Sequence, residues 1–255
     1  METVYGPVSS WRLGRSLGVD PICREGKICS FDCVYCSLGP TTEKTIERKV
    51  FVPTEQVAQA LEKAIKKVEA DVVTFSGTGE PTLAKNLGEL IEVARDISGL
   101  PIAVLTNSSL KTRRDVRRDL SKADIVKGKL DVPNEELFGQ INRPHDGIIF
   151  GEIVEGLKKF CGEFKGKFQL EVMFIPENKN FSEEIAKIVR EIRPDEVQIN
   201  TPLRPSSIRP LTPEELKEVQ RDFEGMNFVS VYEAKKPEVK KAVGLKKLQV
   251  LKRVE

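Results

Sequence analysis

Histidine and tryptophan are almost absent from the sequence, with one residue of each, and no apolar run is long enough to cross a membrane. A bilayer needs about 20 consecutive apolar residues. The N-terminal segment, Met-Glu-Thr-Val-Tyr-Gly-Pro, lacks the charged-then-apolar pattern of a secretory signal. We therefore expect a cytoplasmic protein with no membrane contact.

Neither sign of charge dominates, since 41 Lys and Arg residues stand against 39 Asp and Glu residues. This balance excludes a simple polycation, so that a nucleic-acid surface would have to be a local patch. The 255 residues include 39% hydrophobic residues, which is enough for a sizeable core and argues against global disorder.

Strand-like and helix-like segments alternate along most of the chain. Short apolar stretches predict strands at 16–22, 71–75, 102–106, 124–130, 168–175 and 196–200. Apolar and polar periodicity predicts helices at 54–69, 86–97, 111–121, 148–161 and 182–192, and a further helix that begins at Thr212. Strands separated by helices favour a parallel sheet. The sequence therefore predicts an α/β fold, a partial (β/α)6 TIM-like barrel.

The six units account for residues 1–210, with a cysteine-rich loop at 23–39. Residues 211–255 are predicted to form a C-terminal helix, a strand and a short basic extension. That extension is rich in lysine, at Lys235, Lys236, Lys240, Lys241, Lys246 and Lys247. In such folds the chemistry gathers in the loops that follow the strands, and the unusual residues of this chain do follow predicted strands.

Four of the five cysteines lie within residues 23–36. In a reducing compartment, clustered thiols indicate metal or redox chemistry rather than disulfides. Cys29, Cys33 and Cys36 form a Cys-x3-Cys-x2-Cys pattern. With Cys23 as a fourth ligand, they could hold a structural zinc ion. Alternatively, the three thiolates could hold a 4Fe-4S cluster with one open iron, and both interpretations stand on the spacing alone.

The segment Cys29-Ser30-Phe31-Asp32-Cys33-Val34-Tyr35-Cys36 resembles the signature loop of the radical S-adenosylmethionine (radical SAM) superfamily, including the aromatic Tyr35 before the last cysteine. The turn Gly77-Thr78-Gly79-Glu80-Pro81 looks like the glycine-rich turn that in this family meets the methionine amino group of SAM. The resemblance implies an enzyme with one 4Fe-4S cluster on Cys29, Cys33 and Cys36. It also implies SAM as cofactor, cleaved to a 5′-deoxyadenosyl radical that abstracts hydrogen from a substrate.

Further SAM contacts are expected at the ends of later strands. Thr106, Asn107 and Ser108 offer hydroxyl and amide groups suited to a ribose or a carboxylate, although such residues also form turns. Lys127 and Lys129 alternate along one strand and would share a face, which is either a solvated outer face or the lining of the barrel. In the barrel they would need an anion, such as the SAM carboxylate or a substrate acid, and Asp131 could pair with either lysine. Asn200 and Thr201 could bind adenine edges. We expect Cys23 to be a spectator thiol and Cys161 to be a core residue.

Within the superfamily, segments such as Val104-Leu105-Thr106-Asn107-Ser108-Ser109 resemble the archaeal branch related to wyosine (tRNA imidazoguanosine) synthases. Those enzymes carry a second cluster on three further cysteines, whereas this chain has only Cys23 in that region. A ferredoxin or a flavodoxin is the expected reductant, and tRNA is a candidate substrate. The candidate RNA patch comprises Lys111, Arg113, Arg114, Arg117, Arg118 and Lys122. The C-terminal lysine run is a second basic patch, and the basic residues Arg204 and Arg209 follow the sixth predicted strand. The alternative function is a zinc-stabilised nucleic-acid-binding module without catalysis.

Overall fold

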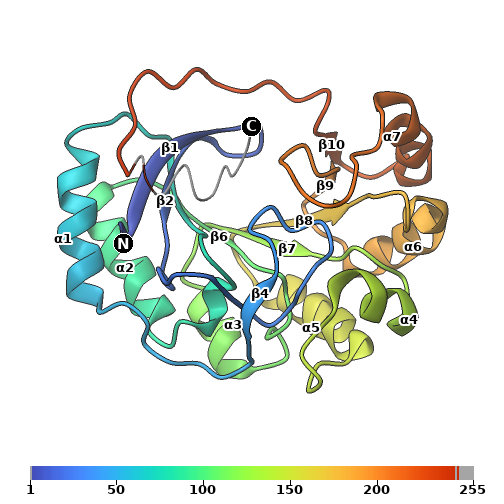
Figure 1. The fold of residues 1–255 in the computed structure, drawn as a ribbon, viewed down its shortest axis with the longest axis horizontal. Helices are drawn as coiled ribbons and strands as arrows, with labels where there is room; N and C mark the ends of the chain where they lie inside the picture. The colour runs from blue at the N-terminus through green and yellow to red at the C-terminus, as the bar shows by residue number, and fades with distance from the viewer. Residues whose placement is uncertain (1, 245, 247–255) are drawn as a thin grey trace.

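The computed structural model describes residues 2–244 and residue 246. In this part of the chain one curled sheet of eight strands has the order β1-β2-β5-β6-β7-β8-β9-β10 (Figure 1). Every neighbouring pair is parallel except β1 and β2. The strands are β1 (Val4–Ser10), β2 (Gly14–Val19), β5 (Val72–Phe75), β6 (Ile102–Leu105), β7 (Ile125–Lys129), β8 (Lys167–Met173), β9 (Glu196–Asn200) and β10 (Phe228–Ser230). The predicted partial barrel of parallel strands is confirmed.

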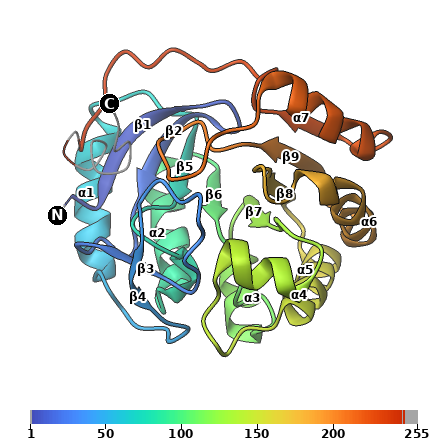
Figure 2. The ribbon, with the colours of Figure 1, turned by 45° about the vertical axis from the view of Figure 1, so that its right-hand side comes forward.

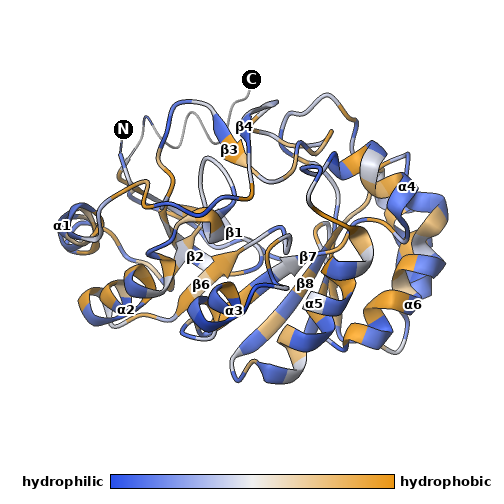
Figure 3. Ribbon diagram, turned by 90° about the horizontal axis from the view of Figure 1, so that it is seen from below, coloured by the Kyte–Doolittle hydropathy of each residue, from blue (hydrophilic) through white to orange (hydrophobic). Residues whose placement is uncertain are grey.

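Helices cover the outer face of the curled sheet (Figure 2). They are α1 (Thr54–Ile65), α2 (Leu87–Ser98), α3 (Arg114–Leu120), the single turn α4 (Glu135–Leu137), α5 (Phe150–Glu163), α6 (Ser182–Ile192) and α7 (Pro213–Gln220). In α6 the apolar residues Ile185, Val189 and Ile192 recur at spacings of three and four and are buried. Figure 3 shows the distribution of apolar and polar residues, with β6 mostly apolar and the helices alternating between apolar and polar residues. None of the helices in the described chain could span a membrane.

The sequence prediction missed three strands. One is β1, which pairs antiparallel with β2 and has an irregular register between Tyr5 and Val8, around a glycine and a proline that hide the strand pattern. The other two are β3 (Lys27–Cys29) and β4 (Thr41–Lys44), which form a separate parallel pair. The prediction of a plain loop at 23–39 was therefore wrong, because a strand of three residues is too short to show periodicity.

The C-terminal part contains the predicted helix and strand, as α7 and β10. Strand β10 pairs with β9 and so extends the main sheet. The chain then returns across the open side of the barrel to β1, where the backbone of Gly6 and Val243 exchange two hydrogen bonds, of 2.9 and 2.6 Å (Figure 1). The domain boundary at residue 210 stays a prediction. Lys247 of the predicted tail lies outside the described residues.

Lys111, assigned above to a basic surface patch, is fully buried. Its ammonium lies over the rings of Phe160 and Phe168, at 5.1 and 5.7 Å from their centroids. Burial lowers its pKa to about 7, against the opposing influence of Glu80. Lys111 is therefore part of the core and does not contribute to a surface for RNA.

Replacing Lys111 with methionine should stabilise the protein at pH 7 by about 1–3 kcal/mol, because a desolvated cation gives way to an apolar side chain of similar length. The folded pKa of about 7 lies below the ordinary 10.5. The unfolded wild-type chain therefore binds more protons between these values, and wild-type stability rises with pH there. The advantage of Lys111→Met should thus shrink from pH 7 to pH 10 in thermal unfolding. The exposed control Lys63→Met should show no such trend, and an advantage that is independent of pH would contradict the assignment.

Candidate functional site

The three cysteines of the Cys-x3-Cys-x2-Cys pattern face one cavity of about 200 Å³, here called the cluster cavity. Cys29 is buried at the end of β3, and Cys33 and Cys36 are partly buried in the turns that follow. Burial, with a smaller influence of Glu80, raises the pKa of the Cys29 thiol to about 12. A thiolate at this position therefore needs a metal centre to displace its proton. The structure thus brings together the predicted metal ligands.

The other two cysteines lie elsewhere. The thiol of Cys23 donates a hydrogen bond to the Glu2 carbonyl at 3.4 Å, and that of Cys161 donates to the Arg193 carbonyl at 3.2 Å. Neither residue lines the cluster cavity. Within the described residues, no three His, Cys, Asp or Glu side chains converge closely enough to hold a single metal ion.

The glycine-rich turn after β5 locks the cysteine loop onto the barrel. The amide of Ile28 donates to the Thr78 carbonyl at 3.0 Å, and the amide of Glu80 donates back to the Ile28 carbonyl at 3.1 Å. A Cβ atom on Gly79 would lie 1.7 Å from that same carbonyl, which requires glycine here. The amide and hydroxyl of Thr78 both donate to one carboxylate oxygen of Asp20, and Gly77 also packs against Asp20. This turn therefore positions the first cysteine.

Glu80 joins the loops that follow β5 and β6. Its buried carboxylate accepts hydrogen bonds from the amide and hydroxyl of Thr82, from the Thr106 hydroxyl at 2.6 Å and from the Asn107 amide at 2.7 Å. The Asn107 side chain in turn donates to Cys29 Sγ at 3.5 Å and to Ser30 Oγ at 2.9 Å. The predicted residues Glu80, Thr106 and Asn107 thus form one network that ends on a cluster thiol.

A second network ends on Cys33. The amide of Asn142 donates to Cys33 Sγ at 3.6 Å and to Asp131 at 2.8 Å, and the Tyr35 hydroxyl also donates to Asp131. Asp131 further accepts the Met173 amide at 2.9 Å. Its oxygens are therefore used by Tyr35, Asn142 and Met173, and the expected direct ion pair of Asp131 with Lys127 or Lys129 does not form in the structure.

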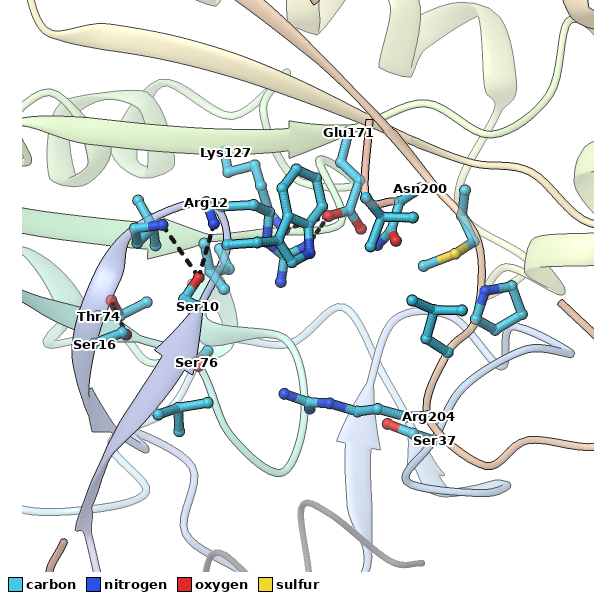
Figure 4. Close-up of a pocket in the computed structure, with 18 of the residues that line it drawn as sticks. Ser10, Arg12, Ser16, Ser37, Thr74, Ser76, Lys127, Glu171, Asn200 and Arg204 are labelled. Carbon is cyan, nitrogen blue, oxygen red and sulfur yellow. Dashed lines mark hydrogen bonds and ion pairs between the residues drawn. The ribbon is translucent and has the colours of Figure 1, made fainter. Parts of the chain in front are cut away.

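Lys127 and Lys129 share the inner face of β7, as predicted, and their partner is Glu171 on β8. The ammonium groups lie 2.6 and 3.4 Å from the Glu171 carboxylate, and Arg12 from the β1–β2 turn is ion-paired with the same group (Figure 4). These cations hold the pKa of Glu171 well below its usual range despite its burial. Burial and Arg12 together lower the pKa of Lys127 to about 7. The Lys129 ammonium also lies 4.5 Å from the centre of the Tyr35 ring.

The remaining predicted SAM contacts differ in whether their polar atoms already form hydrogen bonds within the protein. The Ser108 hydroxyl is buried and accepts the Lys129 amide at 2.9 Å. The Thr201 hydroxyl donates to the Phe174 carbonyl and accepts the Leu211 amide, both at 2.8 Å. Asn200 uses its side-chain oxygen on the Thr201 amide and lines a second, larger cavity. The hydroxyl groups of Ser108 and Thr201 therefore bind backbone groups at this edge of the sheet.

The second cavity, here called the barrel cavity, has a volume of about 380 Å³. It shares Cys36, Lys127, Lys129 and Glu171 with the cluster cavity. Sequence reasoning gave no role here to Arg12, because that residue lies in the turn of the missed β1–β2 hairpin. Arg204 was noted only as a basic residue after the sixth predicted strand, and its place in a cavity follows from the curl of the sheet.

Replacing Glu80 with glutamine should lower the free energy of unfolding by about 2–4 kcal/mol, since one of its two acceptor oxygens becomes a donor that faces other donors. Chemical denaturation of Glu80→Gln measures this loss. The exposed Glu62→Gln on α1 provides the matched control. Equal stability of the two variants would show that the Glu80 network does not hold the two loops together.

Comparisons with known proteins agree with this geometry. The model of the radical SAM superfamily matches residues 26–192. A UPF0026 protein of Methanocaldococcus jannaschii is 40% identical over 228 residues, which cover 87% of this chain and 70% of that protein. A UPF0026 protein of Synechocystis is 41% identical over 225 residues, which cover 87% of this chain and 79% of that protein.

Solved structures share the fold at low identity. A TYW1 structure with a lysine–pyruvate adduct bound has a TM-score of 0.63 and 16% identity, covering 84% of this chain and 74% of that chain. A structure of anSMEcpe with bound AdoMet has a TM-score of 0.62 and 19% identity, covering 85% of this chain and 64% of that chain. The resemblance drawn from the cysteine loop is confirmed, and the chain belongs to the UPF0026 proteins of the radical SAM superfamily.

Proposed function

We propose that Cys29, Cys33 and Cys36 hold a single 4Fe-4S cluster with one open iron, and that this radical SAM enzyme binds SAM beside it. The observation that carries the proposal is that these three thiols surround one cavity, which Gly79 and Lys129 also line. When bound, the cluster supplies the electron that cleaves SAM to methionine and a 5′-deoxyadenosyl radical, which removes a hydrogen atom from the substrate.

The protein tunes this site through two amides. Asn107 and Asn142 donate hydrogen bonds to the sulfur atoms of Cys29 and Cys33. Hydrogen bonds to ligand sulfurs stabilise the extra negative charge of a reduced cluster and raise its reduction potential. Lys27 adds a buried cation beside the loop, and the nearby Cys36, Cys29 and Cys33 raise its pKa against the effect of burial.

We infer that SAM occupies the cluster cavity and part of the barrel cavity. Lys129 and Asn200 are the polar side chains best placed to touch it, together with the backbone of the Gly77–Glu80 turn. The hydroxyl groups of Thr106, Ser108 and Thr201 already form hydrogen bonds within the protein. The side chains of Thr78 and Glu80 do the same. These five residues therefore position the loops around the site rather than touch SAM. Tyr35 and Asn107 hold the cysteine loop through their hydrogen bonds.

A ferredoxin or flavodoxin in the cytoplasm is the proposed electron donor. Transfer RNA stays a prediction for the substrate. The patch offered for it is weakened by the structure, since Lys111 is buried and the side chains of Arg113 and Arg117 are ion-paired with Asp115 and Glu163. A salt-dependent affinity for tRNA would support this substrate. An absence of binding at low salt would discard it.

Replacing Cys36 with alanine should abolish both the 4Fe-4S electron paramagnetic resonance signal and the formation of 5′-deoxyadenosine with dithionite. Cys161→Ala is the matched control, because its thiol faces Arg193 far from the cavity residues, and it should retain iron and cleave SAM. Iron, zinc and 5′-deoxyadenosine are measured after anaerobic purification. Stoichiometric zinc without iron in the wild-type protein would instead support a zinc-stabilised nucleic-acid-binding module.

A further inference from the structure

The barrel cavity contains more cations than carboxylates. Its charged walls come from four different parts of the chain, namely the β1–β2 turn, the inner faces of β7 and β8, the loop after β9 and the C-terminal segment (Figure 4). The cations are Arg12, Lys127, Lys129, Arg204 and Lys236. Glu171 is the one carboxylate among the described residues that line the cavity. A cavity of this composition attracts an anion.

Glu171 cannot balance this charge alone. Arg12, Lys127 and Lys129 all contact its carboxylate, whose side chain is only 5% exposed. Lys129 has a further negative neighbour in Asp131, which together with Glu171 raises the pKa of Lys129 against the effect of burial. Arg12 and Lys127 are left to share a single carboxylate. In addition, the Nε atom of Arg12 is buried without a hydrogen-bond partner in the described structure.

Arg204 increases the excess of positive charge. It lies across the cavity from Lys127 and Glu171, and its side chain extends from the loop after β9 in the direction of Ser76 (Figure 4). No ion pair or side-chain hydrogen bond of Arg204 is formed with the described residues. Arg204 is an exposed residue at the mouth of the cavity, and the surrounding protein and the neighbouring Arg12 lower its pKa. A guanidinium presents a planar fork of donors that fits a carboxylate or a phosphate group.

SAM does not remove this imbalance. The molecule carries one carboxylate, but it also carries a sulfonium cation and an amino group. In the proposed arrangement its carboxylate lies beside the cysteine loop and Lys129, a residue that lines both cavities. Bound SAM would therefore leave Arg12, Lys127 and Arg204 with Glu171 as their shared anion, and would place a further positive charge near them.

The anion site also has a preformed geometry. Arg12 is held by its ion pair with Glu171 and by the neighbouring Trp11 ring, whose centroid is 5.1 Å from the guanidinium carbon. The turn that carries both residues is closed by Ser10, whose hydroxyl accepts the backbone amides of Arg12 and Leu13 at 3.2 and 3.1 Å. Arg12 is therefore already held in place before a ligand binds, which reduces the entropic cost of binding.

We propose that the substrate of this enzyme is a small molecule with an oxyanion group, a carboxylate or a phosphate, which binds between Arg12 and Arg204 in the barrel cavity. The proposal rests on the proposed function for its assignment as substrate, but the anion site itself does not depend on SAM cleavage. The volume of about 380 Å³ sets the size class, because the cavity must also admit part of SAM.

The test uses the full chain with its cluster reconstituted anaerobically and with saturating SAM. Malonate and inorganic phosphate are the probes, titrated separately at constant ionic strength by isothermal titration calorimetry. Trp11 is the only tryptophan and lines the cavity, so its fluorescence gives a second readout. At least one probe should bind with 1:1 stoichiometry and alter the Trp11 emission, and the stronger probe identifies the type of oxyanion.

Arg204→Gln should weaken binding of that probe by about tenfold or more, because one charge-assisted hydrogen-bonded contact is lost. The variant should fold, since Arg204 leaves no ion-pair partner behind, and circular dichroism checks this. Arg209→Gln is the matched control, because this exposed arginine lies in the same loop and pairs with Glu215 outside the cavity. It should bind the probe like the wild type.

The proposal is overturned if neither probe binds, or if Arg204→Gln and Arg209→Gln bind equally well. Displacement of the bound probe by tRNA, but not by a mononucleotide, would assign the site to a nucleic-acid phosphate and overturn the small-molecule substrate. SAM cleavage by the wild-type protein is measured in parallel. Cleavage without anion binding would reject this inference alone. Anion binding without cleavage would reject the proposed function and the assignment of the anion as substrate, and would leave the anion site itself in place.

Discussion

The buried carboxylate of Glu80 is the contact on which the rest of the site depends. The cysteine loop has little core of its own, and its first ligand, Cys29, is fixed at the end of a strand of only three residues. Glu80 holds the loop after β6 through Thr106 and Asn107, while its own backbone amide holds the carbonyl of Ile28. One residue thereby fixes both the backbone that leads to Cys29 and the amide that donates to its sulfur. A charged group can do this inside the protein only because four donors satisfy it.

The parallel sheet explains why so many charged side chains lie inside the barrel. Successive residues of a strand point to opposite faces, so Lys127 and Lys129 both point inward while Val126 points into the helix-covered core. The register of β7 and β8 sets Lys129 directly opposite Glu171. Curling of the sheet then brings the β1–β2 turn and its Arg12 over the same carboxylate. The polar interior is therefore a consequence of strand alternation combined with closure of the sheet.

Much of this fold could be predicted from the sequence, because its units are long and periodic. Six strands of the main sheet fall close to the predicted ranges, namely β2, β5, β6, β7, β8 and β9. Cys29, Cys33 and Cys36 do face one cavity. The failures have physical causes. Strand β1 is interrupted by Gly6 and Pro7, and β3 is too short to show a period. Lys111 looked like a surface charge because no local pattern shows that its ammonium lies over the rings of Phe160 and Phe168. Asp131 looked like a lysine partner because the sequence does not show where Tyr35 and Asn142 point.

The same limit applies to the charge balance of the site, which depends on contacts between distant strands. Lys129 lies between the Glu171 carboxylate on one side and the side chains of Cys33 and Cys36 on the other. Negative charge gained by the thiols when they bind a metal centre strengthens the attraction of Lys129 toward them. Glu171 is then left increasingly to Arg12 and Lys127. The electrostatics of the two cavities are therefore coupled through Lys129, so that the state of the cysteine loop influences how strongly the barrel cavity attracts an anion.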